Sequence, residues 1–447
     1  MSRVALKLVD TGLQFASLRG KLSRPSPGFA LVDGRELAVG LDAECNARIK
    51  PRRLHSRFWQ DLGTAPLGRP FPGYLRTADL AHAHLKAVWE ADGGGAEEVV
   101  VAVPGTYSDD QLALFLGIAR ELAIPVCGLV DVAVAAAADR ELPSHVLHLD
   151  LHFHRVVLTE LEHGDELVRK GVRTEDRVGL LGLRDTWVRV IAQTFVRTTR
   201  FDPLQLAATE QVLYAQLAEH LEVLTEEEST EVRIVSGGRR HSVEIERSRI
   251  VDAAAAAYAG VVSLVENSEE RDDTVLLLSH RAAALPGLVE HLDQLTAFKV
   301  VVLHPAAAAS GALAHADRIL STGSGVRFTT RLPGLDARPP GPVTIAVTPP
   351  PDGRRPLPTH LVVDGVAHRI NSAPLTLGPS GVEAGLEPNH GAASVRRVAG
   401  QAILDAPAEA GVVLNGDPIE GRTVLTAGDQ LRFGNAGSEI LVVAMAD

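Results

Sequence analysis

A proline-rich stretch between Leu332 and Pro358 divides the chain into two parts. Proline has no backbone N–H and a fixed φ, so a stretch this rich in proline cannot form a helix or a central strand. Within it, only Val343–Val347 is predicted to be a short strand. We therefore expect an N-terminal domain over residues 1–330, a linker over 331–358 and a second domain over 359–447.

The length and charge of the chain limit the classes of protein it can belong to. Its 447 residues allow two to four folding units, at about 100–200 residues each. The formal net charge of −12 argues against nucleic-acid binding, which depends on clustered Lys and Arg. We therefore expect partners that are proteins and not DNA or RNA.

Cysteine usage and hydropathy favour a cytoplasmic location. Cys45 and Cys127 lack the spacing of a zinc site, so we interpret both as free thiols in a reducing compartment. The N-terminal residues have no signal-peptide pattern, and no run of about 18 apolar residues is present to span a membrane. The prediction is a cytoplasmic protein without a membrane span.

The N-terminal part repeats one local plan. A strand from Val4 to Val9, a turn containing Asp10 and Gly12, and a second strand recur as a strand, a turn and a strand around Asp150. Strands and helices alternate after each hairpin, with helices expected over 78–91, 109–123, 131–140, 185–198, 203–224, 248–266, 285–295 and 306–316. This alternation predicts an α/β fold, and the repeat predicts lobe I over about 1–143 and lobe II over about 144–330.

The C-terminal part is predicted to be all β. Short strands, separated by turn residues at about ten-residue spacing, are typical of a β-sandwich. The strands are expected over 360–363, 367–370, 375–377, 393–397, 401–404, 411–414, 430–433 and 440–444.

Several stretches of the N-terminal part occur in the order seen in the DnaK-type branch of the actin, sugar-kinase and heat-shock ATPase superfamily. They are Val9-Asp10-Thr11-Gly12, Val103-Pro104-Gly105, Leu129-Val130-Asp131, Leu149-Asp150-Leu151 and His304-Pro305-Ala306. The part therefore resembles that family, and the resemblance implies a two-lobed actin-like ATPase fold, with duplicated mixed-sheet lobes and Mg-ATP between them. Asp10, Asp150 and Asp131 would be its catalytic candidates. The cofactor contacts would be Asp10, Thr11, Gly12, Asp150, Ser279 and His280.

The chain departs from that family where phosphates need glycine. The second hairpin would read Asp-Leu-Gly-Gly-Gly-Thr in the family, but here residues 150–155 read Asp-Leu-His-Phe-His-Arg. Ser279, His280 and Arg281 replace the glycine pair of the adenosine motif. A Cβ at these positions should block close approach of the backbone to phosphates. ATP binding is therefore doubtful on the sequence alone.

Histidines alternate along the second hairpin and suggest a metal site. His148, Asp150, His152 and His154 would share one face of a continuous strand, with ligand types that suit a transition metal. A turn near His152 would instead scatter these side chains.

The end of the chain resembles a forkhead-associated domain. Asn415-Gly416 and the later run Gly428-Asp429 match that family's pattern, which implies that Asn415 and Gly416 contact a peptide. However, Gly378-Pro379-Ser380 replaces the Gly-Arg-Ser that binds phosphothreonine, so the strong charge-assisted bond to phosphate is missing.

Two functions remain open at this point. The first is a non-canonical, chaperone-ATPase-like scaffold or regulatory protein with weak or no ATP hydrolysis, acting through protein–protein interactions. The second is a working Mg-ATP-dependent ATPase switch. A phosphopeptide reader and a metalloprotein are further alternatives that rest on fewer residues.

Overall fold

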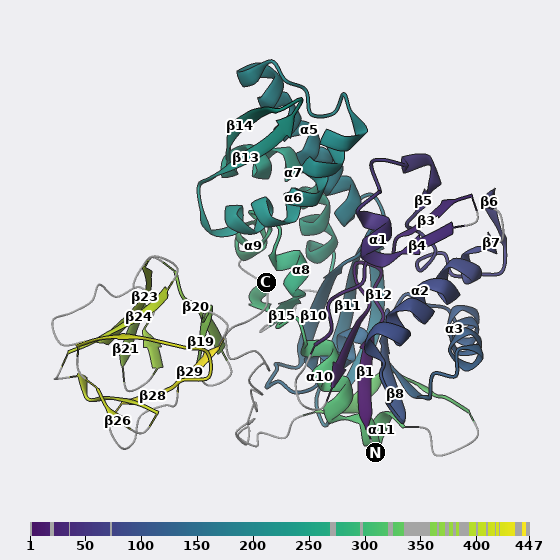
Figure 1. Cartoon of the computed structure of the whole chain (residues 1–447). Coiled ribbons are helices and arrows are strands. Elements are labelled where there is room, and N and C mark those ends of the chain that lie inside the picture. The colour runs from purple at the N-terminus through teal and green to yellow at the C-terminus, as the bar shows by residue number, and fades with distance from the viewer. Residues whose placement is uncertain are drawn as a thin grey trace. The chain divides into compact units, whose positions relative to one another are not determined.

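The computed structural model describes residues 2–17, 22–34, 36–71, 74–268, 274–295, 298–320 and 325–334, and ten shorter segments between 358 and 443. Those segments are 358–363, 366–371, 375–378, 381–383, 393–398, 401–407, 410–415, 417–419, 421–433 and 440–443. The chain forms two compact units, Met1–Pro342 and Val343–Asp447 (Figure 1). The short strand predicted over 343–347 lies outside the described residues.

The first sheet of the N-terminal unit begins with a hairpin. β1 (Arg3–Lys7) pairs antiparallel with β2 (Gln14–Ser17). On the other side of β1, β8 (Glu98–Val103), β9 (Val126–Asp131) and β17 (Phe328–Thr329) follow in parallel, in the order β17-β9-β8-β1-β2. The central strand β8 is a continuous apolar run from Val99 to Val103 and is fully buried, as expected for a strand that is covered on both faces.

The second sheet repeats this plan. Its hairpin is β10 (His145–Leu151) with β11 (Val156–His163), and β12 (Glu166–Glu175) adds a further antiparallel strand. β15 (Thr274–Leu278) and β16 (Phe298–Val302) follow in parallel beside β10. With β18 (Arg331–Pro333) beside β12, the order is β16-β15-β10-β11-β12-β18. In each sheet, the first strand of the hairpin therefore carries parallel strands on its other side.

Two short alanine-rich helices pack together and share one hydrophobic core with strands of both sheets. They are α4 (Val132–Ala137) and α10 (Ala307–Ala314). They cross so closely that a Cβ on Gly311 would lie 1.9 Å from the carbonyl oxygen of Ala135. Glycine at this position is therefore required for the helices to pack.

The remaining elements of the first half cover its sheet. α2 (Thr77–Asp92) and α3 (Asp109–Glu121) share a hydrophobic core with β1 and β8. Ser108 and Gln111 form a capping box that starts α3. The smaller elements are β3 (Ala30–Asp33), β4 (Glu36–Val39), α1 (Gly40–Glu44), η1 (Pro51–Arg53), β5 (Leu54–His55), β6 (Pro66–Phe71) and β7 (Tyr74–Arg76). Three of these strands form a separate sheet in the order β4-β3-β5.

Most of the second half's helices form a region that we call the head, in the upper part of Figure 1. It comprises α5 (Leu180–Thr199), α6 (Ala207–Glu226), α7 (Arg247–Glu266) and the hairpin of β13 (Ser229–Ser236) with β14 (Arg239–Glu246). The apolar sides of these elements share one core, in which the Trp187 indole donates to the carbonyl of Ile250 at 2.9 Å. The short helices α8 (His280–Ala283), α9 (Leu288–Asp293) and α11 (Ala316–Ile319) complete the unit.

Among the helices that the structure describes, α7 is long and apolar enough to cross a membrane by length and composition. Its residues Ile250, Ala254, Tyr258, Val261 and Val265 are nevertheless buried in the head. These residues form one face of the helix, and 28% of its most apolar window is buried inside the structure.

The C-terminal unit consists of two antiparallel sheets around one core. The first has the order β20-β19-β29-β28-β25-β26 and the second β22-β21-β23-β24-β27. The strands are β19 (His360–Val363), β20 (Val366–Arg369), β21 (Leu375–Gly378), β22 (Gly381–Glu383), β23 (Ala393–Val398), β24 (Gln401–Ala406), β25 (Val412–Leu414), β26 (Asp417–Pro418), β27 (Gly421–Val424), β28 (Gln430–Phe433) and β29 (Ile440–Val443).

Among the boundaries that differ from those predicted, three have a clear physical reason or change the lobe assignment. The residues of β17 fall in the range predicted for lobe II, but the strand pairs with β9 of the first sheet. β18 falls in the predicted linker, yet it pairs with β12, and its Pro333 is tolerated because the strand lies at the sheet edge. The helix predicted over 285–295 is shorter in the structure, where α9 covers only Leu288–Asp293, because Pro286 and Gly287, the latter with φ of 81°, precede it.

Candidate functional site

The turn containing Asp10 lies against the turn of the second hairpin. Gly28 donates its N–H to the carbonyl of Asp10 at 2.7 Å and so fixes the turn. The Asp10 side chain is 4% exposed, and its Oδ1 accepts the N–H of Phe153 at 3.2 Å. His152 Nδ1 lies 3.3 Å from the same oxygen. Oδ2 is buried without a hydrogen-bond partner among the described residues.

Asp150 lies in β10, in the second sheet, and is 2% exposed. Its Oδ1 accepts the N–H of Leu151 at 2.9 Å. Burial alone would raise the pKa of Asp150, but nearby Lys7, His152 and His148 and a hydrogen bond with Ser279 hold it well below its usual range. The predicted pair of carboxylates is therefore buried at one site, and Asp150 is ionised there.

Arg281 reaches from α8 across to the Asp10 turn. Its guanidinium donates to the Thr11 hydroxyl and, at 3.5 Å, to the Gly12 carbonyl. A Cβ on Gly12 would lie 2.6 Å from Arg281 Nη2. Burial lowers the pKa of Arg281, while Asp150 and Asp10 act to raise it. An arginine of the chain therefore occupies the space beside the glycine that the family resemblance assigned to phosphate.

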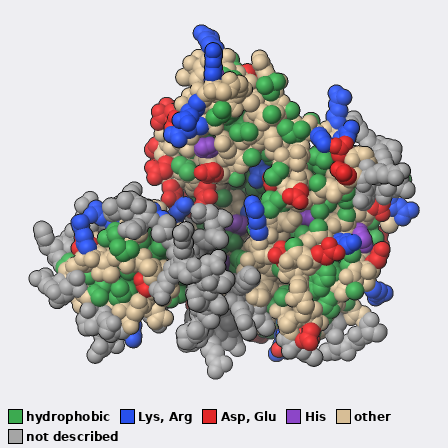
Figure 2. Space-filling model, in the orientation of Figure 1, with side chains coloured by type: hydrophobic (Ala, Val, Ile, Leu, Met, Phe, Trp, Pro, Cys, Tyr) green, Lys and Arg blue, Asp and Glu red, His purple; other side chains and the backbone are tan. Residues whose placement is uncertain are grey.

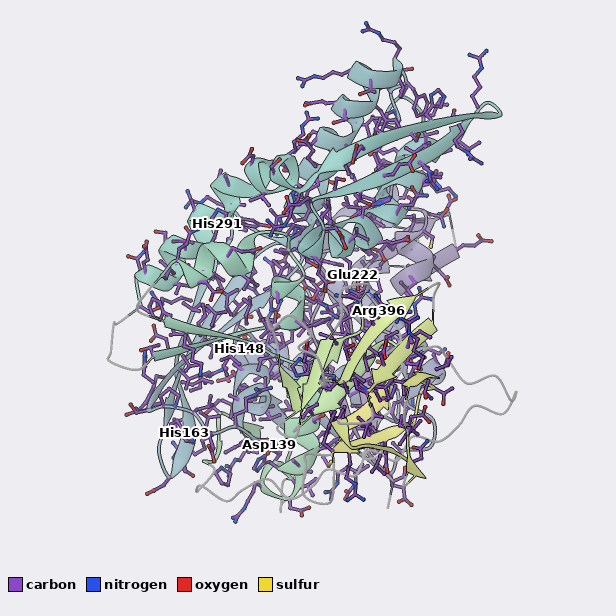
Figure 3. The ribbon with its side chains drawn as sticks, turned by 90° about the vertical axis from the view of Figure 1, so that its left-hand side faces the viewer. Asp139, His148, His163, Glu222, His291 and Arg396 are labelled. Carbon is purple, nitrogen blue, oxygen red and sulfur yellow. The ribbon has the colours of Figure 1, made fainter. Side chains whose placement is uncertain are left out.

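A small cavity lies beside Asp150. This cavity of about 10 Å³ is lined by Lys7, His148, Asp150, Ser279, His280 and His304, among others. That volume is close to what one water molecule needs. Figure 3 shows His148 among the strands of the second sheet, where β10 carries it. The predicted cofactor contacts Ser279 and His280 thus line a space far smaller than a nucleotide.

Burial weakens the basic groups around this cavity. Lys7 is 6% exposed, and burial together with the Arg281 charge lowers its pKa to about 8. Burial lowers the pKa of His280 to about 3 and also lowers the pKa of His148 and His304. These histidines are therefore neutral near pH 7 and act as hydrogen-bonding groups.

Asp131, the third catalytic candidate, has its oxygens engaged by the fold. Oδ1 accepts the N–H groups of Ala133 at 2.9 Å and Val134 at 3.3 Å, which caps α4. Oδ2 pairs with Arg169 Nη1 at 2.7 Å. The carboxylate is fully buried. In this structure Asp131 starts a helix and balances an arginine, which are structural tasks.

The four predicted metal ligands separate at the end of β10. His148 and Asp150 face the cavity from the strand, but the strand ends at Leu151 and His152 begins a turn closed by a 2.9 Å bond from its N–H to the Arg155 carbonyl. His154 instead lies 3.0 Å from the Ser56 hydroxyl. Across the described ranges, no three His, Cys, Asp or Glu side chains are placed to hold a metal ion. The geometry therefore gives the metal prediction no support.

Sequence reasoning did not assign roles to Lys7 and Arg281. Lys7 offered one signal, a single charged residue in an otherwise apolar strand. For Arg281, the sequence offered no signal except its position in the motif where the family has a pair of glycines. Arg155, which ends the turn of the second hairpin, donates to the Thr106 hydroxyl at 2.7 Å.

In the C-terminal unit, Asn415 stabilises a turn of the sandwich. Its Nδ2 donates to Asp429 at 2.9 Å, and its Oδ1 accepts the N–H of Gln430 at 2.8 Å. Asn415 has a φ of 53°, a conformation that Asn tolerates better than most residues. Both polar atoms of the predicted peptide contact are thus bonded within the fold. The other predicted contact, Gly416, lies outside the described residues.

Neither a scan against models of protein families nor a search of curated proteins found a match to this chain.

Proposed function

We propose that the N-terminal unit is a two-lobed, actin-like ATPase fold that has become a pseudo-ATPase. The repeated strand order of the two sheets supports this proposal, as does the presence of Asp10 and Asp150 at equivalent hairpins. The whole protein then acts as a non-canonical, chaperone-ATPase-like scaffold or regulator in the cytoplasm, with weak or no ATP hydrolysis and with proteins as partners.

The occupation of the cleft by side chains of the chain is the observation that carries this proposal. Phosphates bind to exposed backbone N–H groups and need glycine so that the backbone can come close. Here Arg281 fills the space beside Gly12, and His152 lies beside Asp10. The Arg281 guanidinium, which is bonded to Thr11, places a positive charge near Asp10 and Asp150. In a Mg-nucleotide complex, the metal ion would supply that charge.

A second candidate, the working Mg-ATP switch, is favoured by one observation. Asp10 Oδ2 is buried without a hydrogen-bond partner among the described residues, so it could accept a water of a hydrated Mg²⁺. For that to occur, Arg281 would have to leave Thr11 and Gly12, and the cavity of about 10 Å³ would have to widen. Relative movement of the two sheets is the kind of change that could achieve both.

The C-terminal unit is proposed to be a forkhead-associated-like interaction module. Its two-sheet sandwich agrees with that proposal. Because Asn415 is bonded to Asp429 and Gln430, binding of a phosphothreonine peptide through that asparagine would cost internal hydrogen bonds. Contact with a partner through another face of the sandwich is therefore preferred.

The test is phosphate release from Mg-ATP by the full chain, compared with Asp10→Asn and Asp150→Asn variants. A pseudo-ATPase releases no more phosphate than the variants do. Turnover in the wild type that both substitutions abolish, with folding intact by circular dichroism, would favour the ATPase switch.

A further inference from the structure

A groove lies on the head, along α5 and the loop that follows it. Its volume is about 260 Å³, and its lining includes Arg189, Ala192, Val196, Arg197, Asp202 and Leu204. Small-molecule sites usually measure about 300–1,000 Å³. The groove is thus smaller than a typical cofactor site and suits one anchoring side chain of a larger partner.

Three residues of the groove's lining, Ala192, Val196 and Leu204, are apolar. Ala192 is buried, whereas Val196 is 41% exposed. Two residues beyond Leu204, Leu206 is 58% exposed. Apolar surface at Val196 and Leu206 is therefore available to a side chain of a partner.

The rim of the groove is basic, although the whole chain is acidic. Arg189 and Arg197 are exposed, and neither forms an ion pair with any residue that the structure describes. Arg189 makes one weak bond, to the Thr186 hydroxyl at 3.4 Å. Asp202, the acidic residue of the lining, accepts the N–H of Leu204 at 2.9 Å and so helps to shape the loop. Figure 2 shows Lys and Arg side chains projecting from the upper part of the unit, where the head lies.

Arg200 adds a third positive charge at the end of α5. It is exposed and adopts φ of 60° at the helix C-cap, a conformation that glycine accepts without strain. Replacement by glycine removes the charge without a demand for a new backbone shape. It therefore supplies a variant that tests charge separately from folding.

We propose that this groove docks an acidic segment of a partner protein. A bulky apolar side chain enters the groove beside Val196, while carboxylates on either side meet Arg189, Arg197 and Arg200. This proposal rests on the proposed function, because it specifies the kind of protein that the scaffold binds. The apolar lining and the net charge of −12 favour a protein segment over nucleic acid.

The experiment is selection of binders from a random 12-residue peptide library against the full chain, followed by fluorescence polarisation of the selected peptides. Peptides rich in Asp and Glu around Trp, Phe or Leu are expected. Their Kd should rise at least tenfold in Arg189→Glu/Arg197→Glu, rise less in Arg200→Gly, and rise with salt in the wild type. Hydrogen exchange should show protection over residues 189–204 in the complex.

Several results would overturn the proposal. They are a library that yields no binders, selected peptides without acidic residues, affinities unaffected by the double charge reversal, and tighter binding of a single-stranded oligonucleotide to the groove. Unchanged thermal midpoints of the variants guard against misfolding. ATP turnover in the cleft would refute the pseudo-ATPase while leaving this test intact, since no groove residue contacts Asp10 or Arg281 by any described hydrogen bond or ion pair.

Discussion

Replacement of Asp131 by alanine should destabilise the N-terminal unit strongly. The substitution removes the cap of α4, which typically costs about 1 kcal/mol. It also removes the partner of Arg169, and hydrogen bonds to charged groups contribute about 1.5–3 kcal/mol. The Arg169 side chain is 23% exposed, so water partly replaces the lost carboxylate and the lower end of that range applies. We expect a total loss of about 2–3 kcal/mol in the free energy of unfolding.

Asp131→Asn separates the two contributions. Asn caps a helix about as well as Asp, so this variant keeps the bonds to Ala133 and Val134 and loses only the ionic part of the contact with Arg169. The expected cost is about 1–2 kcal/mol. A double-mutant cycle of Asp131→Asn with Arg169→Met should return a coupling energy of similar size.

Urea denaturation followed by tryptophan fluorescence measures these changes. The three tryptophans of the chain, Trp59, Trp89 and Trp187, all lie in the N-terminal unit, so the signal reports on that unit. A cost below about 0.5 kcal/mol for Asp131→Ala, within the range of ordinary surface substitutions, would refute the structural role. Loss of nucleotide binding in Asp131→Asn without loss of stability would restore Asp131 as a catalytic candidate.

Further predictions concern Arg281, Lys7 and Asn415. Arg281→Ala should lower the free energy of unfolding by about 1–3 kcal/mol, because it removes the buried donor to the Thr11 hydroxyl and the Gly12 carbonyl; equal urea midpoints for variant and wild type would contradict this. For Lys7, the folded pKa of about 8 lies below the ordinary 10.5, so the unfolded chain binds more protons between these values and stability should rise over that pH window, by at most about 1.4 kcal/mol per pH unit. Lys7→Met should flatten that rise, and an unchanged pH profile would count against a buried Lys7. Asn415→Ala should speed hydrogen exchange across β25 and β28, because it removes two hydrogen bonds and places alanine at a positive φ. Asn415→Gly loses the same bonds without the backbone strain, so its effect should be smaller; unchanged exchange in both variants would contradict this.

Local patterns predicted much of the fold. The alternation of strand and helix, the two hairpins with Asp10 and Asp150, and helices α2, α3 and α7 all follow from apolar periodicity and cap residues. These features depend on neighbours within one or two turns of the chain, which is the range that a sequence pattern describes. The apolar pattern over 285–295 includes Pro286 and Gly287, so it predicted a helix longer than α9, which begins only at Leu288.

The candidate site was harder to predict because its contacts join distant residues. The approach of Arg281 to Thr11 spans 270 positions of sequence, and it depends on how β15 and the Asp10 turn are brought together. Asp131 carried a family resemblance, yet its role is set by Arg169 on β12. The histidine alternation does not continue as one strand face for a local reason, since the chain turns after Leu151 and His154 lies beside Ser56.

Isothermal titration of Mg-ATP into the full chain, beside Asp10→Ala as the matched control, tests the central claim most directly. If Arg281 and His152 fill the cleft, neither protein should give heat of binding at high protein concentration, and the two titrations should be indistinguishable. Micromolar binding by the wild type that is lost in Asp10→Ala would contradict the pseudo-ATPase account and show that the cleft opens to admit a nucleotide.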